Sequence, residues 1–387
     1  MFSLLLAIIY LAFISLGLPD SLLGSAWPVM RPEFGASLSF AGVISMIISG
    51  GTILSSLTSN RISHRFGTGR VTAVSVAMTA AALLGFSLSS SLFSLCLFAI
   101  PYGLGAGGVD AALNHYVALH YSGRHMSWLH CMWGIGASVS PYIMSFSISR
   151  GSWRDGYLTV SIIQFVLTLF LFLSLPLWKN GSEEENKKAP ESAQLGITDA
   201  LRIRGVPYVL IAFFCYCALE GTCGLWASSF FVECRGIDKE TAASLAALLY
   251  LGITFGRFLN GFLADRLGDA TLIRIGCCIM LGGMALTALP VQICAFIGLP
   301  VIGLGCAPVY PCIIHATPTS FGAENSQAIV GIQMASAYIG STFIPPFFGW
   351  LARNTGLSLY PFFLIAFALL LLFMTERLRA VLKKQAS

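Results

Sequence analysis

The chain has 387 residues, of which 56% are hydrophobic and 10% charged, and its mean hydropathy is +0.80. Soluble domains carry about 25% charged residues, so this composition excludes an ordinary water-soluble protein. The net charge of +5 is small and lies mainly on the predicted loops, so we expect no nucleic-acid partner.

Stretches of about 20 apolar residues, long enough to cross a bilayer as helices, recur along the whole chain. We therefore predict an all-α integral membrane protein with twelve transmembrane helices. The first segment has neither a basic leading region nor a small-residue cleavage site, so we interpret it as a retained helix and not a signal peptide. The predicted segments, with ends placed to within a few residues, are 3–30, 38–58, 70–90, 92–119, 126–149, 156–178, 207–231, 240–264, 269–289, 291–315, 324–350 and 354–380.

Asp20 lies near the middle of the first segment, in the run Ile14–Met30. A carboxylate there costs about 2.5–3.5 kcal/mol on insertion, so it marks a functional site by default. Pro19 lacks the N–H of a helix hydrogen bond and is expected to loosen the helix beside the acid, as Pro308 and Pro345 are expected to do later in the chain. Broken backbone beside a buried acid is typical of a substrate site. We predict that Asp20 binds substrate and takes part in proton coupling.

The fourth and fifth segments contain a second polar group. Asp110 and Asn114 are four residues apart and share one helical face. We predict that Asp110 takes part in proton coupling, because the proton affinity of a carboxylate changes when a cavity around it opens or closes. The alternative is an acid that stays protonated and bonds between helices. Trp133 lies mid-helix among glycines, which suits either a ring stacked on a sugar or core packing.

The longest polar stretch, 179–206, predicts a flexible, charged cytoplasmic linker between two six-helix halves, 1–178 and 207–387. Landmarks recur across it at an offset near 200, which indicates a duplicated architecture. Parallel halves of this kind predict a substrate site between them, near the middle of the membrane. The matched landmarks are Asp20 with Glu220, His64–Gly67 with Asp265–Gly268, Gly103–Ala106 with Gly303–Cys306, and His130 with Gln333.

Of 17 acids, only Asp20, Asp110 and Glu220 lie well inside predicted helices. Glu220 follows an unbroken helix, so we predict that it stays protonated or pairs with a base such as Arg257, while contributing to substrate binding and coupling. Arg257, eight residues from its helix end, lies roughly 12 Å inside the membrane. We predict a gating role for it. The alternatives are pairing with Asp110, and snorkelling to the interface or bonding to backbone carbonyls. Tyr338 lies in the middle of the eleventh segment. Its ring, like that of Trp133, suits either stacking on a sugar or core packing.

The distribution of Lys and Arg predicts the orientation in the membrane. With the N-terminus inside, 15 of the 22 Lys and Arg residues fall on cytoplasmic segments, six fall on the opposite side, and Arg257 remains within the membrane. We predict a multi-pass protein of the bacterial inner membrane with both termini in the cytoplasm.

The segment Gly261–Gly268, GFLADRLG, resembles the loop signature G-x-L-A-D-R-x-G of the major facilitator superfamily. The resemblance covers the whole chain and implies the major facilitator fold of two six-helix pseudo-repeats. It also implies that Asp265 and Arg266 help to hold the cytoplasmic side shut in one state. The first-half copy departs from the signature, because Asn60 stands where the glycine would be and His64 where the acid would be.

Within that superfamily the chain is similar to the bacterial fucose permease group. Asp20 stands where that group has a first-helix Asp, and Asp110–Asn114, DAALN, resembles a fourth-helix run with an acid and an amide. Leu129–Gly136, LHCMWGIG, resembles a fifth-helix run with a substrate-contacting Gln, which is replaced here by His130. The resemblance implies that His130 and Asn114 contact the substrate.

No motif for ATP binding occurs, nor a catalytic motif such as H-E-x-x-H or G-x-S-x-G, so we predict a gradient-driven transporter and not an enzyme, without cofactor or metal. Three buried acids and several amide or imidazole groups favour proton-coupled symport of a small polar solute such as a sugar, by alternating access. Proton-coupled efflux of drugs or amphipathic metabolites is the alternative. The expected partners are the small-molecule substrate, protons and the lipid bilayer, and we expect a monomer. The predicted substrate-binding residues are Asp20, Asn114, His130, Trp133, Glu220, Gln333 and Tyr338.

Overall fold

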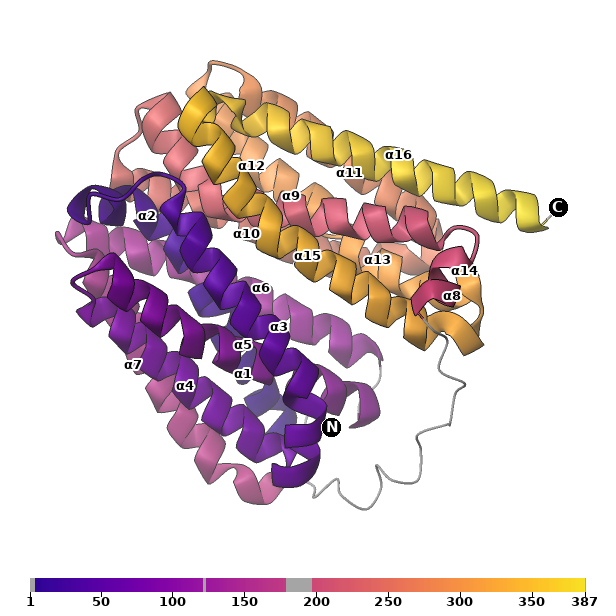
Figure 1. Ribbon diagram of the computed structural model, residues 1–387, viewed down its shortest axis with the longest axis horizontal. Helices are drawn as coiled ribbons and strands as arrows, with labels where there is room; N and C mark the ends of the chain where they lie inside the picture. Colours follow the sequence, from indigo (N-terminus) through magenta and orange to yellow (C-terminus); the bar gives the residue numbers. More distant parts are fainter. Residues whose placement is uncertain (1–3, 121–122, 179–196, 387) are drawn as a thin grey trace. The chain divides into compact units, whose positions relative to one another are not determined.

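The computed structural model describes residues 4–120, 123–178 and 197–386, apart from some side chains within helices. All regular elements in these ranges are helices (Figure 1). They are α1 Leu4–Asp20, α2 Leu22–Glu33, α3 Phe40–Phe66, α4 Thr68–Leu88, α5 Leu92–His120, α6 Gly123–Ser149, α7 Trp153–Leu173, η1 Leu175–Leu177, α8 Ile197–Arg202, α9 Val206–Arg235, α10 Lys239–Leu267, α11 Asp269–Ala288, α12 Gln292–Cys306, α13 Val309–His315, α14 Thr317–Phe321, α15 Ala323–Thr355, η3 Leu357–Leu359 and α16 Tyr360–Ala386.

Each of the twelve predicted segments coincides with a long helix or with a pair of helices broken at one point. Within the described ranges, nine spans are long and apolar enough to cross a membrane. Of the other three segments, α3 is apolar over Phe40–Ser56, whereas α6 and α15 are 27 and 33 residues long. The prediction of an all-α, multi-pass membrane protein is confirmed.

The first predicted segment is broken beside its acid, as expected. Helix α1 ends at Asp20, α2 begins at Leu22, and Ser21 forms a turn between them. A similar break separates α12 from α13 at Pro308. The expectation for Pro345 is wrong, because α15 continues through it without a break. A proline removes the helix hydrogen bond to the carbonyl four residues earlier, here that of Ser341, and transmembrane helices tolerate this loss. The Pro345 carbonyl itself accepts a hydrogen bond of 2.9 Å from the indole N–H of Trp226, which joins α15 to α9.

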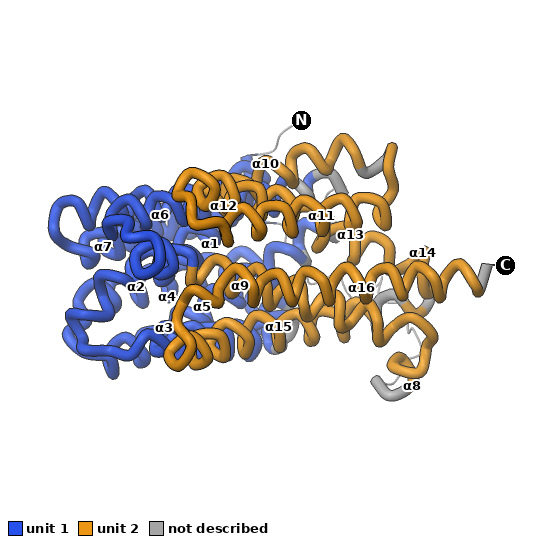
Figure 2. The backbone as a smooth tube through the Cα atoms, turned by 90° about the horizontal axis from the view of Figure 1, so that it is seen from above, with its two compact units in different colours: residues 1–189, 227–247 blue, residues 190–226, 248–387 orange. Residues whose placement is uncertain are grey.

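The chain divides into two compact units, coloured separately in Figure 2. Unit 1 comprises residues 1–189 and 227–247, and unit 2 comprises 190–226 and 248–387. The end of α9 and the start of α10 thus group with helices of the first half, and the predicted six-plus-six division stays a prediction. Most of the predicted linker lies outside the described residues, and its later part contains the short helix α8.

Glycines allow the same close helix crossing in both units. A Cβ on Gly103 in α5 would clash with the Ile48 carbonyl of α3, and a Cβ on Gly303 in α12 would clash with the Leu249 carbonyl of α10. Small residues at such crossings let helix backbones approach within a membrane. Because residues 200 apart make equivalent contacts, the structure supports the internal repeat seen in the sequence.

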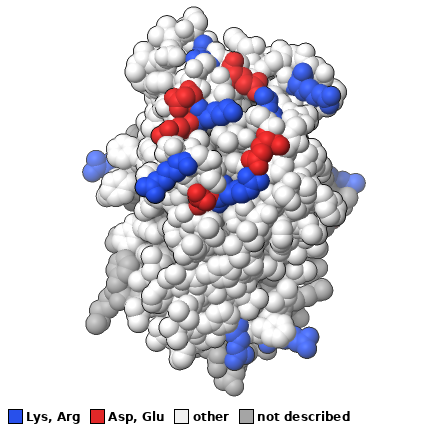
Figure 3. All heavy atoms as spheres, turned by 90° about the vertical axis from the view of Figure 1, so that its left-hand side faces the viewer, with Lys and Arg blue, Asp and Glu red and all other residues white. Residues whose placement is uncertain are grey.

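Charged side chains in the structure gather toward helix ends. Figure 3 shows one face on which Lys, Arg, Asp and Glu lie mainly in the upper part, above a broad band of other residues. Within unit 1, Arg31 of α2 pairs with Glu233 of α9 at 2.5 Å, and Arg154 of α7 pairs with Glu33 of α2 at 2.6 Å. The indole of Trp153 also donates to Glu33 at 2.6 Å. Paired charges at helix ends, beside a band free of Lys, Arg, Asp and Glu on this face, fit a protein that spans a bilayer.

Candidate functional site

Two aromatic donors converge on the carboxylate of Asp20. The indole Nε1–H of Trp133 in α6 donates to Oδ2 at 2.7 Å, and the hydroxyl of Tyr102 in α5 donates to Oδ1 at 3.4 Å. Asp20 is exposed although it lies about 24 Å from one end of the α1–α2 span and about 20 Å from the other. An exposed carboxylate at this depth needs water or polar partners around it, since contact with lipid would be costly.

Close packing of α1 on α6 explains how Trp133 reaches Asp20. A Cβ on Gly17 would clash with the Trp133 carbonyl, and a Cβ on Gly136 would clash with the Ile14 carbonyl. The two helices therefore touch backbone to backbone, and Asp20 lies one turn beyond Gly17 on the same face. Glycines that are visible in the sequence thus position the acid and the indole.

Replacing Gly136 by alanine is expected to lower the unfolding temperature, because overpacking at a close helix contact costs about 1–3 kcal/mol. The matched control is Gly282→Ala in α11, where an added Cβ meets nothing within 4 Å. In a helix, that change should stabilise by roughly 0.5–1 kcal/mol. Thermal unfolding of both variants in the same detergent measures the difference. Equal unfolding temperatures would contradict the backbone-to-backbone contact.

Asp110 and Asn114 form a second polar group in α5. The Asn114 amide donates to the Asp110 carboxylate at 2.8 Å and to the Asp110 backbone carbonyl at 3.0 Å. Both side chains are half-buried. The predicted shared face is therefore confirmed, and the amide orients the carboxylate of the preceding turn.

His130 of α6 packs against α1. Its ring stands edge-on to Phe13, with the centroids 5.8 Å apart. One turn earlier in α6, His125 shares a hydrogen bond of 2.9 Å with the hydroxyl of Tyr10. Sequence reasoning missed Tyr10, His125 and Tyr102. For Tyr102 a signal was present, because it directly precedes the glycine-rich run of the fourth predicted helix.

In unit 2, Glu220 of α9 lies beside Arg257 of α10, with Oε1 3.9 Å from the guanidinium. The two side chains are only 19% and 13% exposed. The Oε1 atom accepts no hydrogen bond from the described residues, so the carboxylate is held loosely. Of the predicted alternatives for Arg257, the structure shows the partner Glu220.

Aromatic side chains surround this pair. Tyr216 and Tyr310 lie close enough to Arg257 to interact electrostatically with it. The Tyr310 ring packs on Phe213 with centroids 4.9 Å apart, and its hydroxyl donates to the sulfur of Met334 at 3.3 Å. Tyr310 therefore joins the surroundings of Arg257 to an apolar cluster that includes Phe213 and Met334.

The remaining predicted residues are not gathered into these groups. Gln333 is fully buried, and its amide and the Thr317 hydroxyl are 3.1 Å apart, so its polar atoms are engaged within unit 2. Tyr338 is half-buried in α15, and Arg266 is exposed near the end of α10. The side chain of Asp265 lies outside the described residues.

Comparison with known proteins gives the family. The Major Facilitator Superfamily matches residues 9–320 and, in an overlapping match, residues 236–386. The glucose/mannose transporter GlcP of Bacillus subtilis (strain 168) is 22% identical over 350 residues, 88% of this chain and 86% of GlcP. Bypass of stop codon protein 6 of Saccharomyces cerevisiae (strain ATCC 204508 / S288c) is 22% identical over 276 residues, 66% of this chain and 56% of the yeast protein.

The solved structure of a D-xylose-proton symporter has the same fold. It superposes with a TM-score of 0.74 at 16% identity, over 96% of each chain. The family match identifies the chain as a multi-pass membrane transporter for a small-molecule substrate and not an enzyme. Because the family match covers well over half of the sequence, the chain belongs to the Major Facilitator Superfamily.

Proposed function

We propose that this transporter is a proton-coupled symporter for a small, neutral, polar solute such as a sugar. The observation that carries the proposal is the exposed Asp20 carboxylate, held by Trp133 and Tyr102 at mid-membrane depth. Such a carboxylate accepts hydrogen bonds from solute hydroxyls, and an indole beside it offers an apolar face to a sugar ring. An anionic solute would be repelled by the same group.

Names among the comparisons support a sugar without identifying one. One relative is a glucose/mannose transporter, and one protein of the same fold is a D-xylose-proton symporter. The motifs around Asp20, Asp110 and His130 further resemble the fucose permease group. We place the substrate contacts at Asp20, Trp133 and His130, with Asn114, Glu220 and Tyr338 as further candidates.

Proton coupling is assigned to the three acids inside the membrane. Asp110 is the first candidate, because Asn114 orients its carboxylate and the pair is half-buried. Asp20 and Glu220 are the other two. Coupling by such a group requires that its surroundings alternate between wet and dry, as alternating access provides.

Gating, orientation and assembly complete the proposal. Asp265 and Arg266 would latch the cytoplasmic side, and Arg257 would respond to the state of Glu220. Both termini face the cytoplasm of a bacterial inner membrane, and the protein acts as a monomer.

Efflux of an amphipathic compound is the second candidate. Tyr216 and Tyr310 beside Arg257 favour it, together with Phe213 and Met334, which contact Tyr310. Such adaptable apolar surfaces accept ligands of varied shape.

Substrate-induced pH changes in membrane vesicles separate the two functions. We expect the external medium to become alkaline when one of a panel of sugars is added to vesicles that contain the protein, but not when cationic dyes are added. The control vesicles contain Asp110→Asn. Proton movement with the dyes and with no sugar would overturn the symport proposal in favour of efflux.

A further inference from the structure

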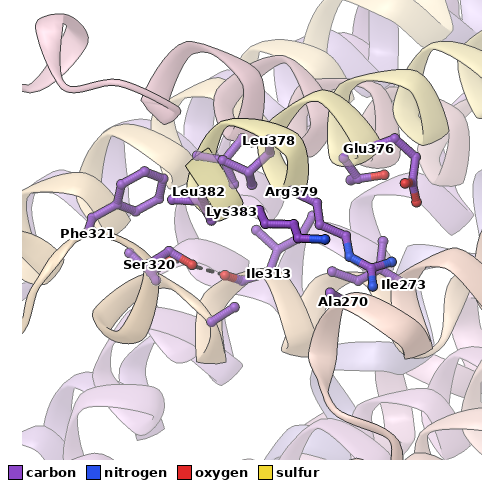
Figure 4. Close-up of a pocket in the computed structure, with 14 residues that line it drawn as sticks. Ala270, Ile273, Ile313, Ser320, Phe321, Glu376, Leu378, Arg379, Leu382 and Lys383 are labelled. Carbon is purple, nitrogen blue, oxygen red and sulfur yellow. Dashed lines mark hydrogen bonds between the residues drawn. The ribbon is translucent and has the colours of Figure 1, made fainter. Parts of the chain in front are cut away.

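A partly open cavity lies within unit 2, apart from the polar groups described above. It has a volume of about 300 Å³. Ligand pockets have volumes of about 300–1,000 Å³, so this cavity lies at the lower end of that range. Its wall comes from α9, α11, α13, α14 and α16 and is largely apolar, with Ile273, Ile313, Phe321, Leu378 and Leu382 among its lining residues (Figure 4). A space of this size and lining suits part of a hydrocarbon chain.

Two cations of α16, Arg379 and Lys383, line the same space. Both are exposed, and within the described ranges neither forms an ion pair or a hydrogen bond. The acids beside them are already engaged. Glu376 pairs with Arg274, whose Nε donates to the carboxylate at 2.6 Å, and Asp269 shares a hydrogen bond of 2.8 Å with His315. Arg379 also acts electrostatically on Glu376, but Glu376 already pairs with Arg274, so the group keeps a net positive charge next to an apolar space.

The two cations lie beyond the last exposed apolar residue of α16, so their long side chains have to extend back along the helix to reach the headgroup layer. Phe373 is 55% exposed and is the last large, exposed apolar residue of that helix. At 1.5 Å per residue, Arg379 lies about 9 Å and Lys383 about 15 Å further toward the C-terminus. The headgroup layer begins where the hydrocarbon ends and adds roughly 5–8 Å on each side. Leu378 and Leu382 alternate with the two cations along α16, so the apolar wall and the charges lie side by side.

We propose that this space is a binding site for one anionic phospholipid, with part of an acyl chain in the apolar space and the phosphate on Arg379 and Lys383. The lipid comes from the leaflet on the side of the C-terminus, predicted here to be the cytoplasmic one. Basic pockets between helices on that side are suited to anionic headgroups. The bound lipid would join α16 to α11, α13 and α14.

The test is native mass spectrometry of the full chain in detergent, titrated with phosphatidylglycerol or with phosphatidylcholine of the same chain composition. We expect one phosphatidylglycerol to bind much more tightly than phosphatidylcholine. Removing both cations (Arg379→Ala with Lys383→Ala) should weaken its binding about 25-fold, since each cation near an anionic headgroup contributes about fivefold. The matched control is Arg377→Ala with Lys384→Ala, which removes the same charge from the same helix outside the cavity lining.

A further variant tests the apolar part of the site. Ala316→Phe adds a ring to the cavity lining and leaves both cations in place. It should weaken phosphatidylglycerol binding about fourfold for each acyl-chain methylene that the ring displaces from the cavity. If both double variants weakened phosphatidylglycerol binding equally, the proposal would be overturned, because the lipid would then be held by the overall positive charge of α16 and not by this cavity. Equal binding of the two lipids, or unchanged binding to Ala316→Phe, would also overturn it. Displacement by inorganic phosphate alone would identify a free-phosphate site instead.

Discussion

Vesicles that contain Asp110→Asn are expected to show no uphill accumulation of the solute. With one proton per solute, an imposed pH gradient of one unit supports about tenfold accumulation, since one unit corresponds to about 1.36 kcal/mol. The variant should reach a ratio of about 1, because an amide of the same shape cannot release a proton. Exchange of labelled for unlabelled solute across liposomes should stay within about twofold of the parent, as it needs no net proton movement.

Both measurements use the solute found by the vesicle pH assay. The matched control is Asp155→Asn, the same chemical change in the first turn of α7, where the side chain is exposed. It should accumulate solute like the parent. Undiminished accumulation by Asp110→Asn would remove Asp110 from the coupling mechanism, whereas loss of exchange as well would assign it to substrate binding.

Asp20→Asn is expected to weaken solute binding by about 1.5–3 kcal/mol, the contribution of a hydrogen bond to a charged group, or about 10- to 150-fold in dissociation constant. Two donors, from Trp133 and Tyr102, meet the two carboxylate oxygens. An asparagine offers one acceptor oxygen, so one donor would then face an amide NH₂. The arrangement that presents the carboxylate to the solute would be lost together with its charge.

Glu220→Gln is the natural comparison, because Glu220 is the repeat partner of Asp20. Its Oε1 accepts no hydrogen bond from the described residues and lies 3.9 Å from Arg257, so an amide should fit with little loss of solute binding. The change should act mainly on the pH dependence of transport. Calorimetric titration of both variants with the same solute compares them. Equal losses, or a larger loss for Glu220→Gln, would reverse the two assignments.

The backbone around the two acids explains why equivalent positions have different surroundings. Helix α1 ends at Asp20, one residue after Pro19, whereas α9 continues from Val206 to Arg235 through Glu220. Asp20 at this break is exposed, while Glu220 on the continuous helix is half-buried. Asp20 and Glu220 therefore lie at similar depths in the two repeats, but their surroundings differ.

Much of the architecture could be predicted from the sequence, because it depends on local properties. Apolar runs of bilayer length define the helices, and Pro19 and Pro308 mark where two of them break. The depth of Asp20 and Glu220 follows from their distance to the helix ends. The spacing of Asp110 and Asn114 placed them on one face, and the structure joins them by a hydrogen bond.

The identity of the side chains that meet in space was decided by tertiary structure. Tyr102 and Trp133 reach Asp20 from two other helices, and the amide of Gln333 lies beside the Thr317 hydroxyl. Such contacts depend on how each helix is rotated about its own axis and on the angle at which it crosses its neighbours. In a membrane the hydrophobic pattern does not specify this rotation, because lipid accepts apolar residues on every face of a helix. Close approach at glycines such as Gly17 sets that rotation, and only the folded bundle shows which backbone each glycine meets.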